Sequence, residues 1–125
     1  MKVVYLAGPY RAPTEYGVQQ NIEAASRVAM EVWKLGAMCF CPHKNTAFFG
    51  GALPDETWLE GDKELIRRSD AVLMMREWMT STGACCENAW ASLLGKPVLY
   101  SLAELEDWLR TENAVEALAA LRRVS

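Results

Sequence analysis

Short apolar runs alternate with stretches of helical periodicity along the whole chain. Four runs are short and apolar enough to be buried strands of a parallel sheet. They are Val3–Ala7, Ala37–Cys41, Ala71–Met75 and Pro97–Tyr100. Each run is followed by a glycine, a proline or a polar residue, which is typical of a strand end. The pattern therefore predicts four strands separated by longer connections.

The connections carry apolar residues at the three- and four-residue spacing of amphipathic helices. We expect helices over Asn21–Leu35, from Asp55 to about Ser69, and over Ala84–Leu94. Gly36 and Gly95 stand where helix C-terminal glycines belong. Asp55 is the expected N-cap of the second helix. Ser101–Glu104 has the pattern of a capping box and predicts a C-terminal helix.

Repeated strand–helix–strand order predicts an α/β fold, with a parallel sheet of four to five strands and helices on both faces. No internal repeat, low-complexity tract or linker interrupts it, so we expect residues 1–125 to form a single domain. Ligands of such sheets bind beyond the carboxyl ends of the strands. This rule selects four segments, which are Gly8–Arg11, Pro42–Asn45, Arg76–Gly83 and Tyr100–Ser101.

Composition narrows the function classes. The 125 residues include 13 Lys and Arg against 16 Asp and Glu, a net charge of −3, so the chain lacks the basic field of proteins that bind polymeric nucleic acid. No apolar run approaches the ~20 residues of a membrane span. The apolar N-terminal stretch is broken at Gly8 and is too short for a signal peptide. We expect a cytoplasmic protein without membrane contact.

The four cysteines fall in two close pairs and are interpreted as reduced thiols, because secreted disulfide scaffolds are richer in cysteine. Cys39, Cys41 and His43 alternate and could ligate zinc. The spacing lacks the usual two-residue gap, however, and no second ligand pair stands nearby, so we expect no metal and place both cysteines on one strand face. Cys85 could be a nucleophile at a helix N-terminus, but the adjacent Cys86 favours small-residue packing.

Two carboxylates stand where helix patterning asks for an apolar residue. Asp62 shares a helix face with Trp58 and Leu65, and Glu87 shares one with Ala84. Burying a carboxylate is unfavourable unless it is paired or hydrogen-bonded. Each could simply pair with a neighbouring group, but two on consecutive helices near the ligand-binding edge favour a functional site. Glu87 also falls in the first turn of its predicted helix, where the dipole favours the ionised form of a nucleophile or general base.

Two segments at the strand ends suggest a phosphate-bearing ligand. Thr80–Gly83 offers hydroxyls and backbone N–H groups at a helix N-terminus, and Gly8–Arg11 adds a guanidinium. The chain has neither a G-x-G-x-x-G fingerprint nor a P-loop, so we expect no dinucleotide or ATP cofactor. His43, at a strand end, is either structural or a contact to a base. Trp78 is positioned in sequence to stack on a base.

Several short motifs occur in an order that resembles one enzyme superfamily. They are Val3–Arg11, Gly61–Asp62, Ser69–Val72 and Ser81–Glu87. Over about residues 2 to 100 the chain is similar to the nucleoside 2-deoxyribosyltransferases and to their hydrolytic relatives, the 2′-deoxynucleoside 5′-monophosphate N-glycosidases. The resemblance implies a flavodoxin-like (Rossmann-like) fold and cleavage of the bond between a nucleobase and C1′ of the sugar.

The resemblance also implies catalytic roles. Glu87 matches the nucleophile that attacks C1′, Tyr5 matches the tyrosine that orients it, and Asp62 matches the aspartate that assists proton transfer to the departing base. Such a pair of carboxylates is consistent with retaining glycosidase chemistry. We expect the substrate to be bound by Gly8, Tyr10, Arg11, His43, Ser81 and Gly83.

The transferases commonly carry an acid six residues before the nucleophile, where this chain has Ser81. Arg11 and Gly83 also fall on phosphate-binding positions of the hydrolases. The resemblance thus favours an N-glycosidase acting on a (deoxy)nucleoside 5′-monophosphate without a cofactor. A base-exchanging deoxyribosyltransferase and a non-catalytic nucleotide-binding module are the alternatives. The resemblance further implies a homodimer with its site near the subunit boundary, although the region that supplies the hydrolases' partner serine does not align here.

Overall fold

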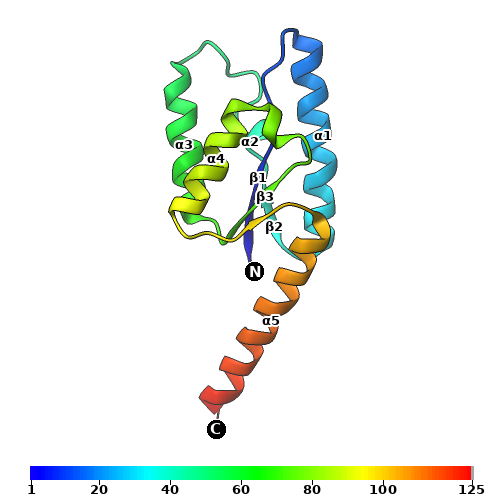
Figure 1. Cartoon of the computed structure of the whole chain (residues 1–125), viewed down its shortest axis with the longest axis vertical. Coiled ribbons are helices and arrows are strands. Elements are labelled where there is room, and N and C mark those ends of the chain that lie inside the picture. The colour runs from blue at the N-terminus through cyan, green and yellow to red at the C-terminus, as the bar shows by residue number, and fades with distance from the viewer. Residues whose placement is uncertain (125) are drawn as a thin grey trace.

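The predicted strands form one parallel sheet in the order β2-β1-β3-β4 (Figure 1). The computed structural model describes residues 1–124, so Ser125, the last residue of the predicted domain, lies outside the described residues. The strands are β1 (Val3–Ala7), β2 (Met38–Phe40), β3 (Ala71–Met74) and β4 (Val98–Leu99). Each coincides with a predicted run or is one or two residues shorter at its ends. The predicted α/β, flavodoxin-like fold is confirmed.

The four predicted helices are present with several different boundaries. The helices are α1 (Glu15–Lys34), α2 (Pro42–Asn45), α3 (Asp55–Arg68), α4 (Thr82–Leu93) and α5 (Leu102–Val124), with a 3-10 turn η1 (Trp78–Thr80). The short helix α2 and the turn η1 are additional. α1 begins six residues before the predicted Asn21, because Thr14 caps it by accepting a hydrogen bond from the Gly17 N–H at 3.0 Å. Asp55 is the first residue of α3 and not its N-cap, which is Pro54.

β1 divides the core into two layers because successive side chains of a strand point to opposite faces. Val4 and Leu6 pack with residues of α1 and α5 on one face. Tyr5 and Ala7 pack with residues of α3 and α4 on the other face. Helices therefore cover both faces of the sheet, as predicted (Figure 1).

All strands are parallel, so their carboxyl ends meet at one edge of the sheet. In Figure 1 this is the upper edge, where α3 and α4 begin and where the connection from α2 to α3 passes. α5 leaves from the opposite end. Its first turns bury Leu105 and Leu109, and its remainder extends away from the body of the molecule (Figure 1). Within residues 1–124 no helix combines the length and apolarity of a membrane span.

Candidate active site

The structure brings Tyr5 and Glu87 into direct contact. Tyr5 is fully buried in β1, which lies between β2 and β3 in the sheet. Its hydroxyl donates a hydrogen bond to Glu87 Oε2. Glu87 lies in α4 with only 8% of its surface exposed. The two residues are 82 positions apart in the sequence and meet because the Tyr5 face of β1 is the face that α4 covers.

Burial determines the charge of Glu87. It raises the pKa of this carboxyl to about 8, the hydrogen bond from Tyr5 opposes the rise, and the nearby charge of Asp62 adds to it. The prediction that Glu87 lies in the first turn of its helix is wrong, because α4 starts at Thr82 and places Glu87 in the second turn. The helix dipole acts mainly within the first turn, so desolvation outweighs it here. Burial and the Glu87 charge also raise the pKa of Tyr5 well above its ordinary value, which keeps its hydroxyl a donor.

Asp62 is the second acid of this group. It lies on α3, which packs beside α4, and is half-buried. Burial raises the pKa of Asp62 to about 6, and its charge affects both Glu87 and Tyr5. Burial confirms the predicted inward direction for Glu87, whereas Asp62 is only half-buried. Two interacting acids with separated pKa values titrate as a pair that holds one proton over the interval between them.

Ser81 and Gly83 lie at the N-terminus of α4, six and four positions before Glu87. Ser81 is the N-cap, and its Oγ accepts a hydrogen bond from the Ala84 N–H at 3.2 Å. A Cβ added at Gly83 would meet only Ser81 Oγ, at 3.9 Å, so packing does not require glycine there. A helix N-terminus with little side-chain cover suits an anion, because the backbone N–H groups and the positive end of the helix dipole lie there.

The segment after β1 carries three of the predicted binding residues. A Cβ at Gly8 would lie 2.9 Å from Met75 Cβ, so close approach of β1 to the end of β3 accounts for this glycine. The backbone carbonyl of Tyr10 accepts a hydrogen bond from Asn21 Nδ2 at 3.0 Å. Arg11 is exposed and pairs with Asp55, at 2.8 Å between Nη2 and Oδ2. The sequence pattern did not indicate the contacts made by Asn21 and Asp55. Each contact joins two segments that are distant in the sequence, and periodicity within one segment does not report on the other.

His43 lies beneath this segment. It is 4% exposed, its Nε2 donates a hydrogen bond to the Pro9 carbonyl at 2.9 Å, and its ring meets Tyr10 edge-on at 5.8 Å between centroids. Its Nδ1 is buried without a hydrogen-bond partner. Burial lowers the pKa of His43, so the neutral ring is favoured near neutral pH. Through these contacts His43 supports the Gly8–Arg11 segment.

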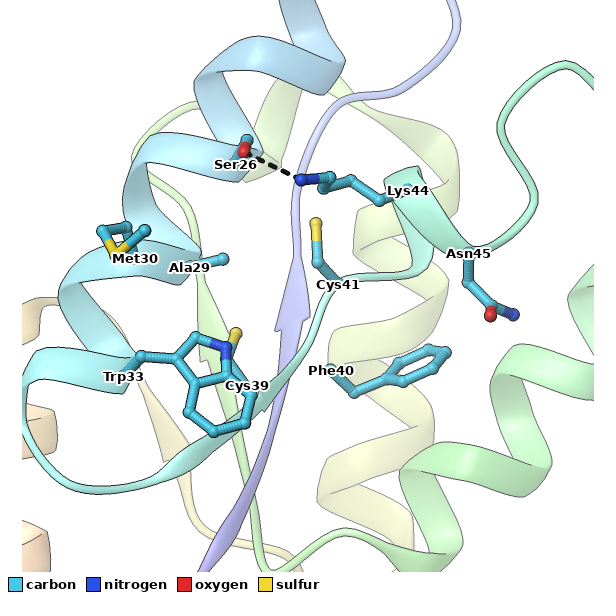
Figure 2. A pocket seen from close by; sticks show the side chains of 9 residues that line it. All are labelled: Ser26, Ala29, Met30, Trp33, Cys39, Phe40, Cys41, Lys44 and Asn45. Atoms are coloured by element: carbon cyan, nitrogen blue, oxygen red, sulfur yellow. Dashed lines mark hydrogen bonds between the residues drawn. The ribbon is translucent and has the colours of Figure 1, made fainter.

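Two cavities lie beside α1 and α2. One of about 370 Å³ is bounded by α1, β2 and α2, and Figure 2 shows Lys44 extending from α2 to Ser26, with 3.3 Å between Nζ and Oγ. A second, of about 460 Å³, is lined by Phe48 and Phe49 among others. Neither cavity is lined by the two carboxylates. The carboxylates instead occupy the α3–α4 side of the sheet.

The cysteines do not join the carboxylates. Cys39 is buried in β2, and Cys41 packs partly against the same layer, as predicted. The strand ends before Cys41, which is the N-cap of α2. Burial raises the pKa of Cys39 to about 12. Cys85 and Cys86 are both exposed, so their interpretation as packed small residues is wrong. The early turns of α4 have solvent on the side of these two thiols.

Comparison with known proteins identifies both a family and a fold. Residues 2–100 match a family described as a domain of unknown function, DUF4406. No curated protein matches the chain. Two similar solved structures are 2-deoxyribosyltransferases. The one from Bacillus psychrosaccharolyticus is 23% identical, with a TM-score of 0.59 over 77% of this chain and 69% of that chain. The one from Leishmania mexicana is 20% identical, with a TM-score of 0.59 over 79% and 63%.

The structure of BlsM is also similar, at 23% identity and a TM-score of 0.56 over 86% of this chain and 69% of that chain. The chain spans 63% of the length of the Leishmania enzyme. These likenesses establish the fold. The fold implied by the predicted resemblance is confirmed.

Proposed function

The chain belongs to the DUF4406 family of domains of unknown function, and from the site assembled on its fold we propose that it hydrolyses the N-glycosidic bond of a (deoxy)nucleoside 5′-monophosphate. The contact of the Tyr5 hydroxyl with the buried carboxyl of Glu87 carries the proposal. Asp62 lies close enough to shift the pKa of Glu87. A carboxylate oriented by a tyrosine can act as the nucleophile at a sugar carbon, and a second acid beside it can protonate the leaving group.

In the proposed reaction Glu87 attacks C1′ through Oε1, while Tyr5 holds Oε2. The bond between C1′ and the base breaks, the electron pair moves to the base nitrogen, and the base takes up the proton of Asp62. A glycosyl ester of Glu87 results. Water then attacks C1′, transfers a proton to Asp62, and releases the sugar phosphate with Glu87 restored.

This sequence of steps requires one proton on the pair of acids. Between pH 6 and 8 the Glu87–Asp62 pair holds one proton, because the pKa values of the two acids lie at about 8 and about 6. Glu87 has the higher pKa, so in the free protein the shared proton resides mainly on Glu87. The productive arrangement, with the proton on Asp62 and the negative charge on Glu87, is the less populated one and has to form with the substrate bound. Interaction of that charge with the Tyr5 hydroxyl and with the developing positive charge at C1′ supports this arrangement.

The 5′-phosphate is assigned to the rim of the site. Ser81 and Gly83 lie at the α4 N-terminus, and Arg11 lies at the same edge of the sheet. Glu87 lies six positions after Ser81, about 9 Å along a helix, which is comparable to the reach of a sugar phosphate. A phosphate at the rim and C1′ at Glu87 are therefore compatible in one ligand.

Base exchange is the second candidate function. Two of the similar structures are described as 2-deoxyribosyltransferases. In that reaction an acceptor base takes the place of water on the glycosyl ester. Ser81, in place of an acid, favours the phosphate-bearing substrate of the hydrolase.

A chromatographic assay for free base tests the proposal. Purified protein is incubated with ribo- and deoxyribonucleoside 5′-monophosphates and with the matching nucleosides, each with and without an acceptor base. We expect base release from monophosphates, reduced roughly 10³-fold or more by Glu87→Gln. Glu23→Gln makes the same change at an exposed position of α1 and is expected to retain wild-type rate.

Two other results would contradict the hydrolase, and a third would contradict its mechanism. Product formed only with an acceptor base identifies the transferase. Monophosphate binding without turnover identifies a binding module. A wild-type rate in Glu87→Gln contradicts the assignment of Glu87 as the nucleophile.

A further inference from the structure

The cation assigned to the substrate phosphate already has an anionic partner. Arg11 Nη2 lies 2.8 Å from Asp55 Oδ2, and the two side chains are 74% and 54% exposed. Arg11 follows β1, whereas Asp55 is the first residue of α3. The pair therefore connects two segments that meet at the carboxyl edge of the sheet.

Helix geometry relates this pair to the carboxylates below it. Asp55 and Asp62 are seven residues apart in α3, which is two turns, so they lie on nearly the same face and about 10 Å apart along the axis. Asp62 lies deep enough for its charge to affect Glu87. Asp55 accordingly occupies the rim end of the α3 face whose deeper end holds Asp62.

We propose that Asp55 is a specificity-determining residue that competes with the substrate's 5′-phosphate for Arg11. The inference rests on the proposed function. A guanidinium presents a planar fork of donors that carboxylates and phosphates bind in the same manner, so one anion must leave for the other to bind well. An exposed ion pair is weak, and a phosphate dianion displaces it readily.

The competition has a consequence for substrate choice. A monophosphate gains Arg11 only after the Asp55 contact is broken, which lowers its net affinity. A free nucleoside leaves the Arg11–Asp55 pair intact, so its affinity is not lowered. Asp55 therefore narrows the preference for monophosphates over nucleosides, and its removal widens that preference.

Asp55 also has a purely structural interpretation, because acids in the first turn of a helix interact favourably with its dipole. Glu56 supplies the matched control. It stands beside Asp55 in the same first turn of α3, so Glu56→Gln removes the same charge from the same helix end. The Arg11 ion pair is made by Asp55.

The test measures binding of a nucleoside 5′-monophosphate and of the matching nucleoside by calorimetry, in the catalytically silent Glu87→Gln background. We expect Asp55→Asn to tighten monophosphate binding about two- to fivefold and to leave nucleoside binding unchanged. Glu56→Gln is expected to change neither. Adding Arg11→Gln is expected to weaken monophosphate binding and to abolish the effect of Asp55→Asn.

Equal effects of Asp55→Asn and Glu56→Gln would overturn the inference, as would an Asp55→Asn effect that survives Arg11→Gln. Failure of the monophosphate to bind would overturn it as well. Binding that follows the expected pattern, combined with no base release by the wild-type protein, would overturn the proposed function and leave the role of Asp55 intact.

Discussion

At the scale of single residues, the site is a carboxylate that the fold makes hard to ionise. Burial raises the pKa of Glu87 to about 8 and that of Asp62 to about 6. Tyr5 partly compensates by donating a hydrogen bond to Glu87. A nucleophile held this way is dry and oriented, which increases its reactivity once it is ionised.

The pH dependence of kcat/KM follows from these two acids. The productive state requires one proton on the pair, so activity should rise as the pair loses its first proton near pH 6 and fall as it loses the second near pH 8. The measurement is kcat/KM for a monophosphate from pH 5 to 9.5. A flat profile through pH 8 would contradict the assignment.

Asp62→Asn separates the two acids in this experiment. It removes the proton that Asp62 supplies and the charge that raises the pKa of Glu87. The small remaining activity is then expected to rise with pH and to show no decline near pH 8. The substrate phosphate, whose second pKa is about 6, affects only the acid side of either profile.

At the scale of elements, close packing of β1 against β3 determines where the binding segment starts. Gly8 follows β1 at a point where a Cβ would lie 2.9 Å from Met75 Cβ. His43 supports the next residues from α2 through the Pro9 carbonyl, and Asn21 holds them from α1. Three elements thus position Arg11 although its own side chain is exposed.

Gly8→Ala tests this packing. The added methyl group would force a shift of Met75 or of the strand end, so we expect a loss of about 1–3 kcal/mol in the free energy of unfolding. Chemical denaturation measures it. Gly61→Ala is the control, because Gly61 lies within α3 with nothing within 4 Å of an added Cβ. That change is expected to stabilise by ~0.5–1 kcal/mol, and equal effects at the two glycines would contradict the packing explanation.

At the scale of the whole molecule, α5 is longer than the surface it covers. Its first turns bury Leu105 and Leu109 against the sheet. Further along the helix Glu116 forms an ion pair with Lys2, with 2.8 Å between Oε1 and Nζ. Beyond the packed turns, apolar side chains of α5 are left exposed. They include Val115, Leu118 and Leu121, at 56%, 58% and 67%. An apolar face of this kind on a helix is typical of an interface.

We expect a second copy of the chain to cover this face and form the homodimer implied by the superfamily resemblance. Light scattering after size exclusion should give twice the 14.0 kDa of one chain. Leu118→Glu should lower the mass towards the monomer, because it places a charge in the apolar face. Thr111→Glu adds the same charge at an exposed polar position of α5 and should leave the dimer intact. A monomeric wild-type protein would contradict this expectation.

The sequence by itself determined the order of strands and helices, the cover on both faces of the sheet, and the inward direction of Glu87. These features follow from local periodicity, because a strand or helix buries residues at fixed spacings. It predicted the start of α1 too late, since the Thr14 cap precedes the apolar stripe.

Only the tertiary structure decided which of these residues meet. The contact of Tyr5 with Glu87, the pair of Arg11 and Asp55, and the position of His43 beneath Pro9 all join segments remote in sequence. The high pKa of Glu87 belongs with them, because it depends on how much water the packed neighbours exclude. Periodicity specifies the face on which a side chain lies, whereas its partners and its solvation are properties of the folded chain.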